Sequence, residues 1–119
     1  MNRVRAQYHL STLRMDRHLT KVARAHTKWM LDHGAFTHGD FARRVTSSGA
    51  RGPAFGENLA WATGSAERAD YIVKMWLESP DHRANLLRRG FRRIGLGELR
   101  GAFAGNGNAV VVTADFAGR

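Results

Sequence analysis

Residues 94–116 read IGLGELRGAFAGNGNAVVVTADF, and this stretch decides the fold class of the chain. Its two ends, 94–99 and 109–116, are rich in apolar and β-branched residues, which favour β-strands. Between them, the sequence GNGN at 105–108 supplies residue types that accept positive φ angles. The pattern predicts an antiparallel hairpin that turns within residues 105–108.

Helical periodicity governs most of the chain before the hairpin. In residues 16–33, apolar side chains recur three or four positions apart, and Gly34 follows where a helix C-cap belongs. Further along, Trp76 lies on an apolar stripe of helical spacing, and Ser79 and Pro80 end that helix and begin another. The predicted elements are a lead-in helix at 2–9, a helix at 16–33, a short helix near 41–45, a strand at 58–62, a helix from an N-cap at Ser65 to about 77, and a helix from Pro80 to about Arg89.

The length of 119 residues suits one domain with a single modest core, so we expect residues 1–119 to form a single domain. Because helices come first and the later strands pair without long crossovers, the predicted class is α+β. No apolar run approaches the roughly 18 residues that cross a bilayer, so we expect no transmembrane segment. The sequence has no cysteine, which excludes disulfides, a thiol nucleophile and a zinc site built on sulfur.

The chain is strongly basic, with 19 Lys and Arg against 10 Asp and Glu and a formal charge of +9. A basic surface favours anionic partners such as nucleic acid, acidic polysaccharide, teichoic acid or anionic lipid headgroups. A solvated surface set by the base composition of the source genome is the simpler explanation. If the charge has a partner, an anionic envelope polymer or lipid surface fits better than nucleic acid, because the clustered arginines lack a reading motif and stacking aromatics. These arginines are Arg83, Arg88, Arg89, Arg92 and Arg93.

Four residues are candidates for chemistry: His38, Glu57, Glu78 and His82. Two neutral imidazoles with carboxylates can bind a divalent metal, and the same groups can act as a general acid–base pair. Spacing alone also allows the simpler interpretation that these are surface histidines bonded to backbone or solvent. His26 lies on the apolar stripe of the 16–33 helix, which predicts a core histidine with a satisfied hydrogen bond.

Five short motifs, in their order and spacing, resemble a known family. The motifs are Phe36-Thr37-His38, Gly56-Glu57-Asn58-Leu59-Ala60, Trp76-Leu77-Glu78-Ser79-Pro80-Asp81-His82-Arg83, Ile94-Gly95-Leu96-Gly97 and Thr113-Ala114-Asp115-Phe116. Together they resemble the bacterial branch of the CAP superfamily, which also includes cysteine-rich secretory proteins, antigen 5 and plant pathogenesis-related 1 proteins. The resemblance covers nearly the whole chain.

The resemblance implies a three-layer α-β-α sandwich with a small antiparallel sheet between helices. It also implies a cleft lined by two histidines and two acidic residues, which binds zinc or another divalent ion in several members. His38 matches the first histidine, Glu57 the glutamate of the Gly-Glu-Asn motif, and His82 the second histidine. Glu78 falls one position short of the family's second glutamate, so we expect it to lie at the periphery of the cleft or to reach it through water.

The predicted function is a secreted binding module whose cleft holds a divalent metal or a small ligand. His38 and His82 are the expected metal ligands, with Zn²⁺ or another divalent ion bound weakly. The alternative is a metal-assisted, protease-like hydrolase; we favour binding, and no catalytic residue is assigned. Residues 1–12 are polar and basic with no targeting signal, which fits either a cytosolic protein or a mature domain cut from a precursor. The resemblance favours a monomer that is secreted or associated with the cell envelope.

Overall fold

The computed structural model describes the backbone of the whole chain and every side chain except those of Ser65 and Glu67. Its elements are α1 (Asn2–Gln7), β1 (Arg14–Met15), α2 (Arg17–His33), α3 (Phe41–Ser47), β2 (Phe55–Ala62), the 3-10 helix η1 (Gly64–Glu67), α4 (Ala69–Leu77), α5 (Pro80–Leu86), β3 (Phe91–Phe103) and β4 (Asn106–Gly118). The side chain of Ser65, the predicted N-cap, lies outside the described part, and α4 begins at Ala69.

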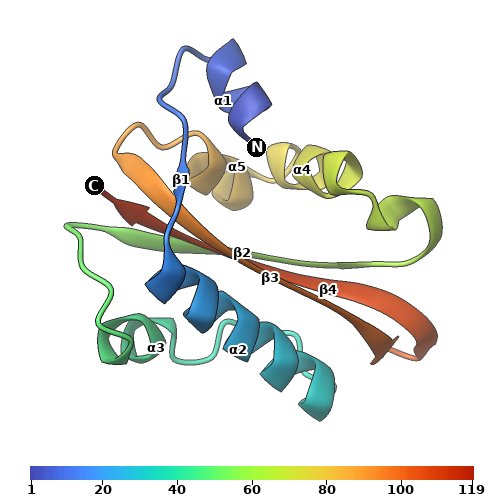
Figure 1. Ribbon diagram of the computed structural model, residues 1–119. Helices are drawn as coiled ribbons and strands as arrows, with labels where there is room; N and C mark the ends of the chain where they lie inside the picture. The colour runs from blue at the N-terminus through green and yellow to red at the C-terminus, as the bar shows by residue number, and fades with distance from the viewer.

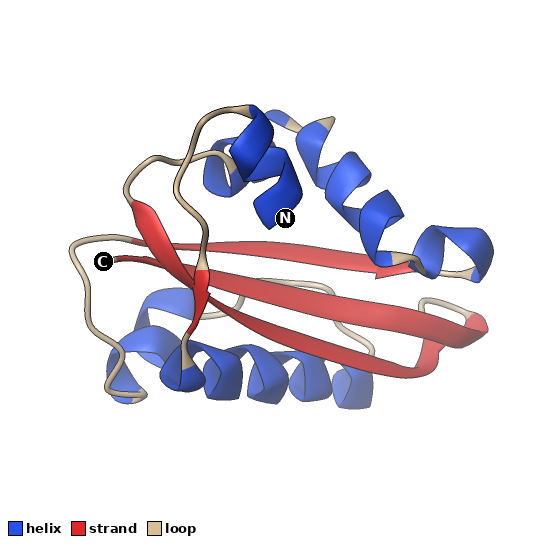
Figure 2. Ribbon diagram, turned by 45° about the horizontal axis from the view of Figure 1, so that its top comes forward, coloured by secondary structure: helices blue, strands red, loops and turns tan.

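Helices cover both faces of a four-stranded sheet with the strand order β1-β3-β4-β2. The helices α2 and α3 lie on one face, and α1, α4 and α5 lie on the other (Figure 1 and Figure 2). Both β2–β4 and β3–β4 pair antiparallel. The fold is therefore an α+β sandwich of three layers, as predicted, and β2 forms one edge of its sheet.

The 94–116 hairpin is confirmed, and Gly105 adopts the expected positive φ, but the turn begins one residue earlier than predicted and does not include residues 106–108. The chain reverses at Ala104 and Gly105, whose φ angles are +52° and +81°, and Phe103 pairs with Asn106. A two-residue turn with two positive φ angles matches the right-handed twist of the flanking strands. The residues at 106–108 continue β4 instead, because the long strand pairing extends to the turn itself.

Sequence periodicity missed the parallel strand β1. Its residues Arg14 and Met15 pair with Arg93 and Ile94 of β3. Two residues are too short to show an alternating pattern, and a parallel pairing joins segments far apart in the chain. The strand directs the chain from α1, across the edge of the sheet, to the start of α2 on the opposite face (Figure 1).

The cap residues of α2 explain where this helix begins and ends. Asp16 accepts a hydrogen bond from the Leu19 amide at 3.0 Å, as an N-cap does. Gly34 adopts a left-handed conformation with φ +61°, so the predicted C-cap is confirmed. None of the helices, within the part of the chain that the structure describes, is long and apolar enough to cross a membrane.

The helices α4 and α5 pack on the face of the sheet opposite α2. Trp76 is only 2% exposed, as the apolar stripe predicts, and its indole N–H donates to the Leu59 carbonyl at 2.9 Å. The helix α5 ends at Leu86, earlier than the predicted Arg89, because the chain turns there into β3. Ser79 occupies the N-cap position of α5, but its side chain makes no capping hydrogen bond.

Candidate functional site

His38 and Glu57 make direct contact at the edge of the sheet. His38 lies in the loop between α2 and α3, and Glu57 is on the edge strand β2. His38 Nδ1 and Glu57 Oε1 are 2.7 Å apart. The Glu57 side chain is 1% exposed and the His38 side chain is 53% exposed. A buried carboxylate thus orients an imidazole whose other side faces solvent.

Arg44 from α3 holds the Glu57 carboxylate in place. One guanidinium nitrogen, Nη2, lies 2.9 Å from each Glu57 oxygen and donates to the His38 carbonyl at 2.6 Å. The side chain of Asp40 caps α3 by accepting from the Arg43 amide, which fixes the helix turn that carries Arg44. The cation therefore compensates the buried anion and ties the His38 loop to the sheet. No sequence signal marks Arg44 for this role, since it resembles any other basic residue of the chain.

His26 of α2 is hydrogen-bonded to the loop that carries His38. It is 3% exposed, and its Nε2 lies 2.6 Å from the Thr37 carbonyl, so this nitrogen donates the hydrogen bond. Burial, as the largest cause, lowers the pKa of His26 from its ordinary value, and the positive charge of Arg44 contributes. The prediction of a core histidine with a satisfied hydrogen bond is confirmed, and the bond it makes fixes the backbone next to His38.

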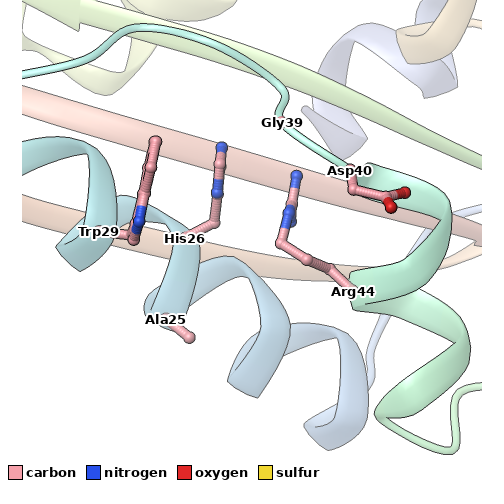
Figure 3. A pocket seen from close by; sticks show the side chains of 6 residues that line it. All are labelled: Ala25, His26, Trp29, Gly39, Asp40 and Arg44. Carbon is pink, nitrogen blue, oxygen red and sulfur yellow. The ribbon is translucent and has the colours of Figure 1, made fainter.

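An open hollow of about 330 Å³ lies between α2 and the start of α3. Figure 3 shows its lining residues, with the planar groups of Trp29, His26 and Arg44 side by side and roughly parallel. The hollow adjoins the His38–Glu57 site, because Arg44 lines the hollow and also binds Glu57.

Asp115 of β4 places a second buried carboxyl group beside Glu57, and the site-residue prediction missed it. It pairs in register with Glu57, is 0% exposed, and sits in a continuous buried run of β4. Burial raises the pKa of Asp115 to about 10, with further increases from hydrogen bonding to and repulsion by Glu57. The Asp115 carboxyl is therefore protonated at neutral pH. The sequence signal that could have identified Asp115 is its position as an ionisable residue within the largely apolar strand 109–116.

The raised pKa of Asp115 predicts a specific dependence of stability on pH. In an unfolded chain an aspartate has a pKa near 3.9, so between that value and about 10 the folded protein binds one more proton. This linkage makes the free energy of unfolding fall as pH rises, by up to about 1.4 kcal/mol per pH unit. We expect Asp115→Asn to be more stable than wild type at pH 8 and to differ little at pH 4.

Urea denaturation of both proteins at pH 4, 6 and 8 measures this difference. The exposed Asp32, whose side chain is 51% exposed, supplies the matched control Asp32→Asn, which should leave the pH dependence of wild type unchanged. If the free energy of unfolding changed with pH in the same way for wild type and Asp115→Asn, Asp115 would be ionised in the folded protein.

His82 approaches the same edge of the sheet from the opposite face. It lies in the first turn of α5, and its carbonyl accepts from Asn58 Nδ2 at 3.0 Å. Asn85 of α5 also binds the edge strand, through the Glu57 carbonyl at 3.1 Å and the Asn58 amide oxygen at 3.0 Å. Since neighbouring side chains of a strand point to opposite faces, Glu57 faces α3 while Asn58 faces α5.

The imidazole of His82 is half-buried and lies within electrostatic range of His38. Burial, and secondly the charge of His38, lower the pKa of His82 from its ordinary value. His82 lines an apolar hollow of about 290 Å³ together with Phe36, Trp61 and five other residues. Phe36 belongs to the loop that carries His38, so this loop and α5 meet at one hollow beside β2.

Glu78 lies apart from the other candidates. It is exposed at the C-terminal cap of α4, and no hydrogen bond joins it to His82 among the side chains that the structure describes. The structure thus brings His38 and Glu57 into contact, with His82 nearby and Glu78 outside. Within the same described side chains, no three His, Cys, Asp or Glu residues gather closely enough to hold a metal ion.

Sequence comparison relates this arrangement to known proteins. The family model described as "Cysteine-rich secretory protein family" (CAP) matches residues 1–116. Protein YkwD of Bacillus subtilis (strain 168) is 34% identical over 101 residues, which are 81% of this chain and 38% of that protein.

Solved structures show the same fold. An extracellular protein containing a SCP domain from Bacillus anthracis str. Ames has a TM-score of 0.81 at 26% identity, covering 99% of this chain and 37% of that one. An outer surface protein from Borrelia burgdorferi has a TM-score of 0.75 at 23% identity, covering 99% of this chain and 86% of that one. The chain spans less than two fifths of the two Bacillus proteins. Because the family model matches almost every residue, the chain belongs to the cysteine-rich secretory protein (CAP) family.

Proposed function

We propose that the chain is an extracellular or envelope-associated binding module that holds a divalent metal ion, or a small ligand, between His38 and His82. The observation that carries this proposal is the 2.7 Å contact between His38 Nδ1 and the buried Glu57 carboxylate. A histidine that binds metal commonly donates its other ring N–H to a carboxylate, which fixes the tautomer and the direction of the ring. With Nδ1 bonded to Glu57, the free Nε2 of His38 is the nitrogen available to a metal.

His82 is suited to be the second ligand. Metal binding requires a neutral imidazole, and burial next to His38 lowers the pKa of His82, so His82 stays neutral to lower pH than an ordinary histidine. Two imidazoles form a sparse ligand set compared with the four ligands of a structural zinc site. We therefore propose weak, exchangeable binding of Zn²⁺ or a similar ion, which the fold does not need for its stability.

The proposed location follows from the relatives. The solved structures include an extracellular protein from Bacillus anthracis and an outer surface protein from Borrelia burgdorferi. We propose that this chain works in the same kind of place, as a monomeric domain. Because the chain spans less than two fifths of the two Bacillus proteins, the proposal takes no activity from those proteins as a whole.

Binding suits the site better than the alternative of metal-assisted hydrolysis. Metal-assisted hydrolysis needs a general base that can reach the metal-bound water. The Glu57 side chain is only 1% exposed, and its carboxylate is already bound by Arg44 and His38. The buried acids Glu57 and Asp115 are shielded from any substrate, so their role is to orient His38.

A zinc titration tests the proposed site. At pH 7.5 and a free zinc concentration ten times Kd, we expect the folded state to gain about 1.4 kcal/mol, seen as a modest rise of Tm. Because protons compete with the metal for the imidazoles, the gain should be smaller at pH 5.5 than at pH 7.5. Calorimetric titration and thermal melts at both pH values measure these quantities.

Single replacements identify the ligands. His38→Ala and His82→Ala should each abolish most of the binding, and Glu57→Gln should weaken it by about tenfold because the ring of His38 loses its orienting anion. The exposed histidines supply controls: His18→Ala and His33→Ala should bind zinc like wild type. Unchanged binding in a His38→Ala/His82→Ala double variant would exclude the proposed site.

A further inference from the structure

A stripe of basic side chains follows the outer face of α2. The basic stripe consists of Arg17, Lys21, Arg24 and Lys28, all exposed. At about 100° per residue, these positions fall within an arc of about 60° and extend for about 16 Å along the helix axis. The buried residues of α2 lie on the opposite side of the helix, so the stripe faces away from the sheet. Figure 2 shows α2 lying against one face of the sheet, with no other layer beyond it.

The basic stripe is not neutralised by the protein itself. Lys28 pairs with Asp32 at 2.5 Å, but Arg17, Lys21 and Arg24 make no ion pair with any described side chain. No acidic residue occurs in α2 before Asp32. The helix therefore carries cations three and four positions apart with no anion between them.

The arrangement opposes the stability of α2. Like charges at these spacings repel along a helix. Arg17 occupies the first turn, where the positive end of the helix dipole disfavours a cation, and this turn contains no acidic residue. Features that break local stability rules are expected at functional surfaces. Arg17, Lys21 and Arg24 are therefore available to an anionic partner.

The surface beside the basic stripe is concave and could accommodate an anionic partner. Arg17, Lys21 and Arg24 line a shallow hollow of about 440 Å³, together with Met15 and Thr20. Guanidinium and ammonium groups on one side of a hollow suit phosphate oxygens, which accept charge-assisted hydrogen bonds.

We infer that the basic stripe binds a linear polymer of phosphodiesters that lacks bases, such as poly(glycerol phosphate). A straight row of cations matches a linear chain of anions better than a flat bilayer, and Met15, 64% exposed, is the single apolar side chain in the hollow available for insertion. Nucleic acid fits less well because base stacking needs a free aromatic face. Trp29, the exposed aromatic of α2, is stacked against both His26 and His33, with ring centroids 5.8 and 4.7 Å away. This inference is independent of the proposed metal site.

Fluorescence anisotropy with labelled poly(glycerol phosphate) tests the inference. With about three phosphate contacts, log Kobs should fall with a slope of about −2 against log salt, so binding weakens about 20-fold between 50 and 200 mM salt. Lys21→Glu/Arg24→Glu should weaken binding at least tenfold. The Tm of this variant should not fall, since the replacements remove repulsion within α2.

The matched control is Arg3→Glu/Arg89→Glu, which changes the formal charge equally through two exposed residues outside α2. This control should bind the polymer within about twofold of wild type. Equal losses in both variants would mean that net charge alone drives binding and would overturn the inference. It would also be overturned if a single-stranded oligonucleotide of equal charge, or vesicles with 30% anionic lipid, bound better than the polymer.

Discussion

Replacing Gly95 by alanine should lower the free energy of unfolding by at least about 3 kcal/mol. Gly95 lies on β3 where α2 crosses the sheet, and a Cβ at this position would overlap the backbone of Leu19 and Thr20. A side chain could rotate away from such a contact, but a helix backbone cannot. The whole of α2 must move outward to admit one methyl group. The neighbouring Gly97 has the same function, since its Cβ would lie 2.5 Å from the Ala23 carbonyl oxygen.

Urea denaturation of Gly95→Ala measures the loss, and Gly107→Ala is the matched control. Gly107 belongs to the same hairpin, has no positive φ, and has open space around its Cβ position. The control should change stability by less than about 0.5 kcal/mol. A Gly95→Ala protein as stable as the control would mean that α2 does not rest directly on β3.

Arg5→Met should destabilise the fold by about 4 kcal/mol, because a buried cation that binds several carbonyl groups is lost. Arg5 is 0% exposed although α1 otherwise lies at the surface. Its guanidinium donates to the carbonyls of Ser11 at 2.8 Å, Leu86 at 2.9 Å, Phe91 at 3.0 Å and Arg88 at 3.1 Å. Methionine fills part of the volume but satisfies none of these acceptors, and each buried carbonyl without a donor costs about 1–3 kcal/mol.

Two further replacements separate the hydrogen bonds from the charge. Arg5→Lys keeps the cation but not the planar fork, so it should recover only part of the loss. Arg3→Met, on the exposed side of the same helix, should change stability by less than about 0.5 kcal/mol. Chemical denaturation of Arg5→Met, Arg5→Lys and Arg3→Met measures the free energy of unfolding of each variant. A loss in Arg5→Met no larger than that in Arg3→Met would show that water satisfies these carbonyls.

Gly95 and Arg5 act on opposite faces of the sheet, and the candidate site depends on both. His38 lies in the loop that follows α2, and α2 can approach β3 closely because of Gly95 and Gly97. His82 lies on α5, whose C-terminal end is bonded by Arg5. The distance between the imidazoles of His38 and His82 therefore depends on how closely α2 and α5 pack on the two faces of the sheet.

The sequence alone determined the elements whose signals are local. The periodicity of residues 16–33 with Gly34 as a cap, the stripe around Trp76, and the apolar hairpin strands each arise from neighbours within one element. Local periodicity also predicted His26 as a core residue. The motifs containing His38, Glu57 and His82 indicated the family, and with it the three-layer architecture.

Only the tertiary structure decided which charged residues are buried and what they bind. Arg5 and Arg44 look like any other basic residue in the sequence, because the burial of a charge depends on partners distant in the chain. Pairing of β2 with β4 sets Asp115 against Glu57, and α3 brings Arg44 to the same carboxylate. Arg44 compensates the cost of removing the Glu57 carboxylate from water, and this compensation exists only once the layers have assembled.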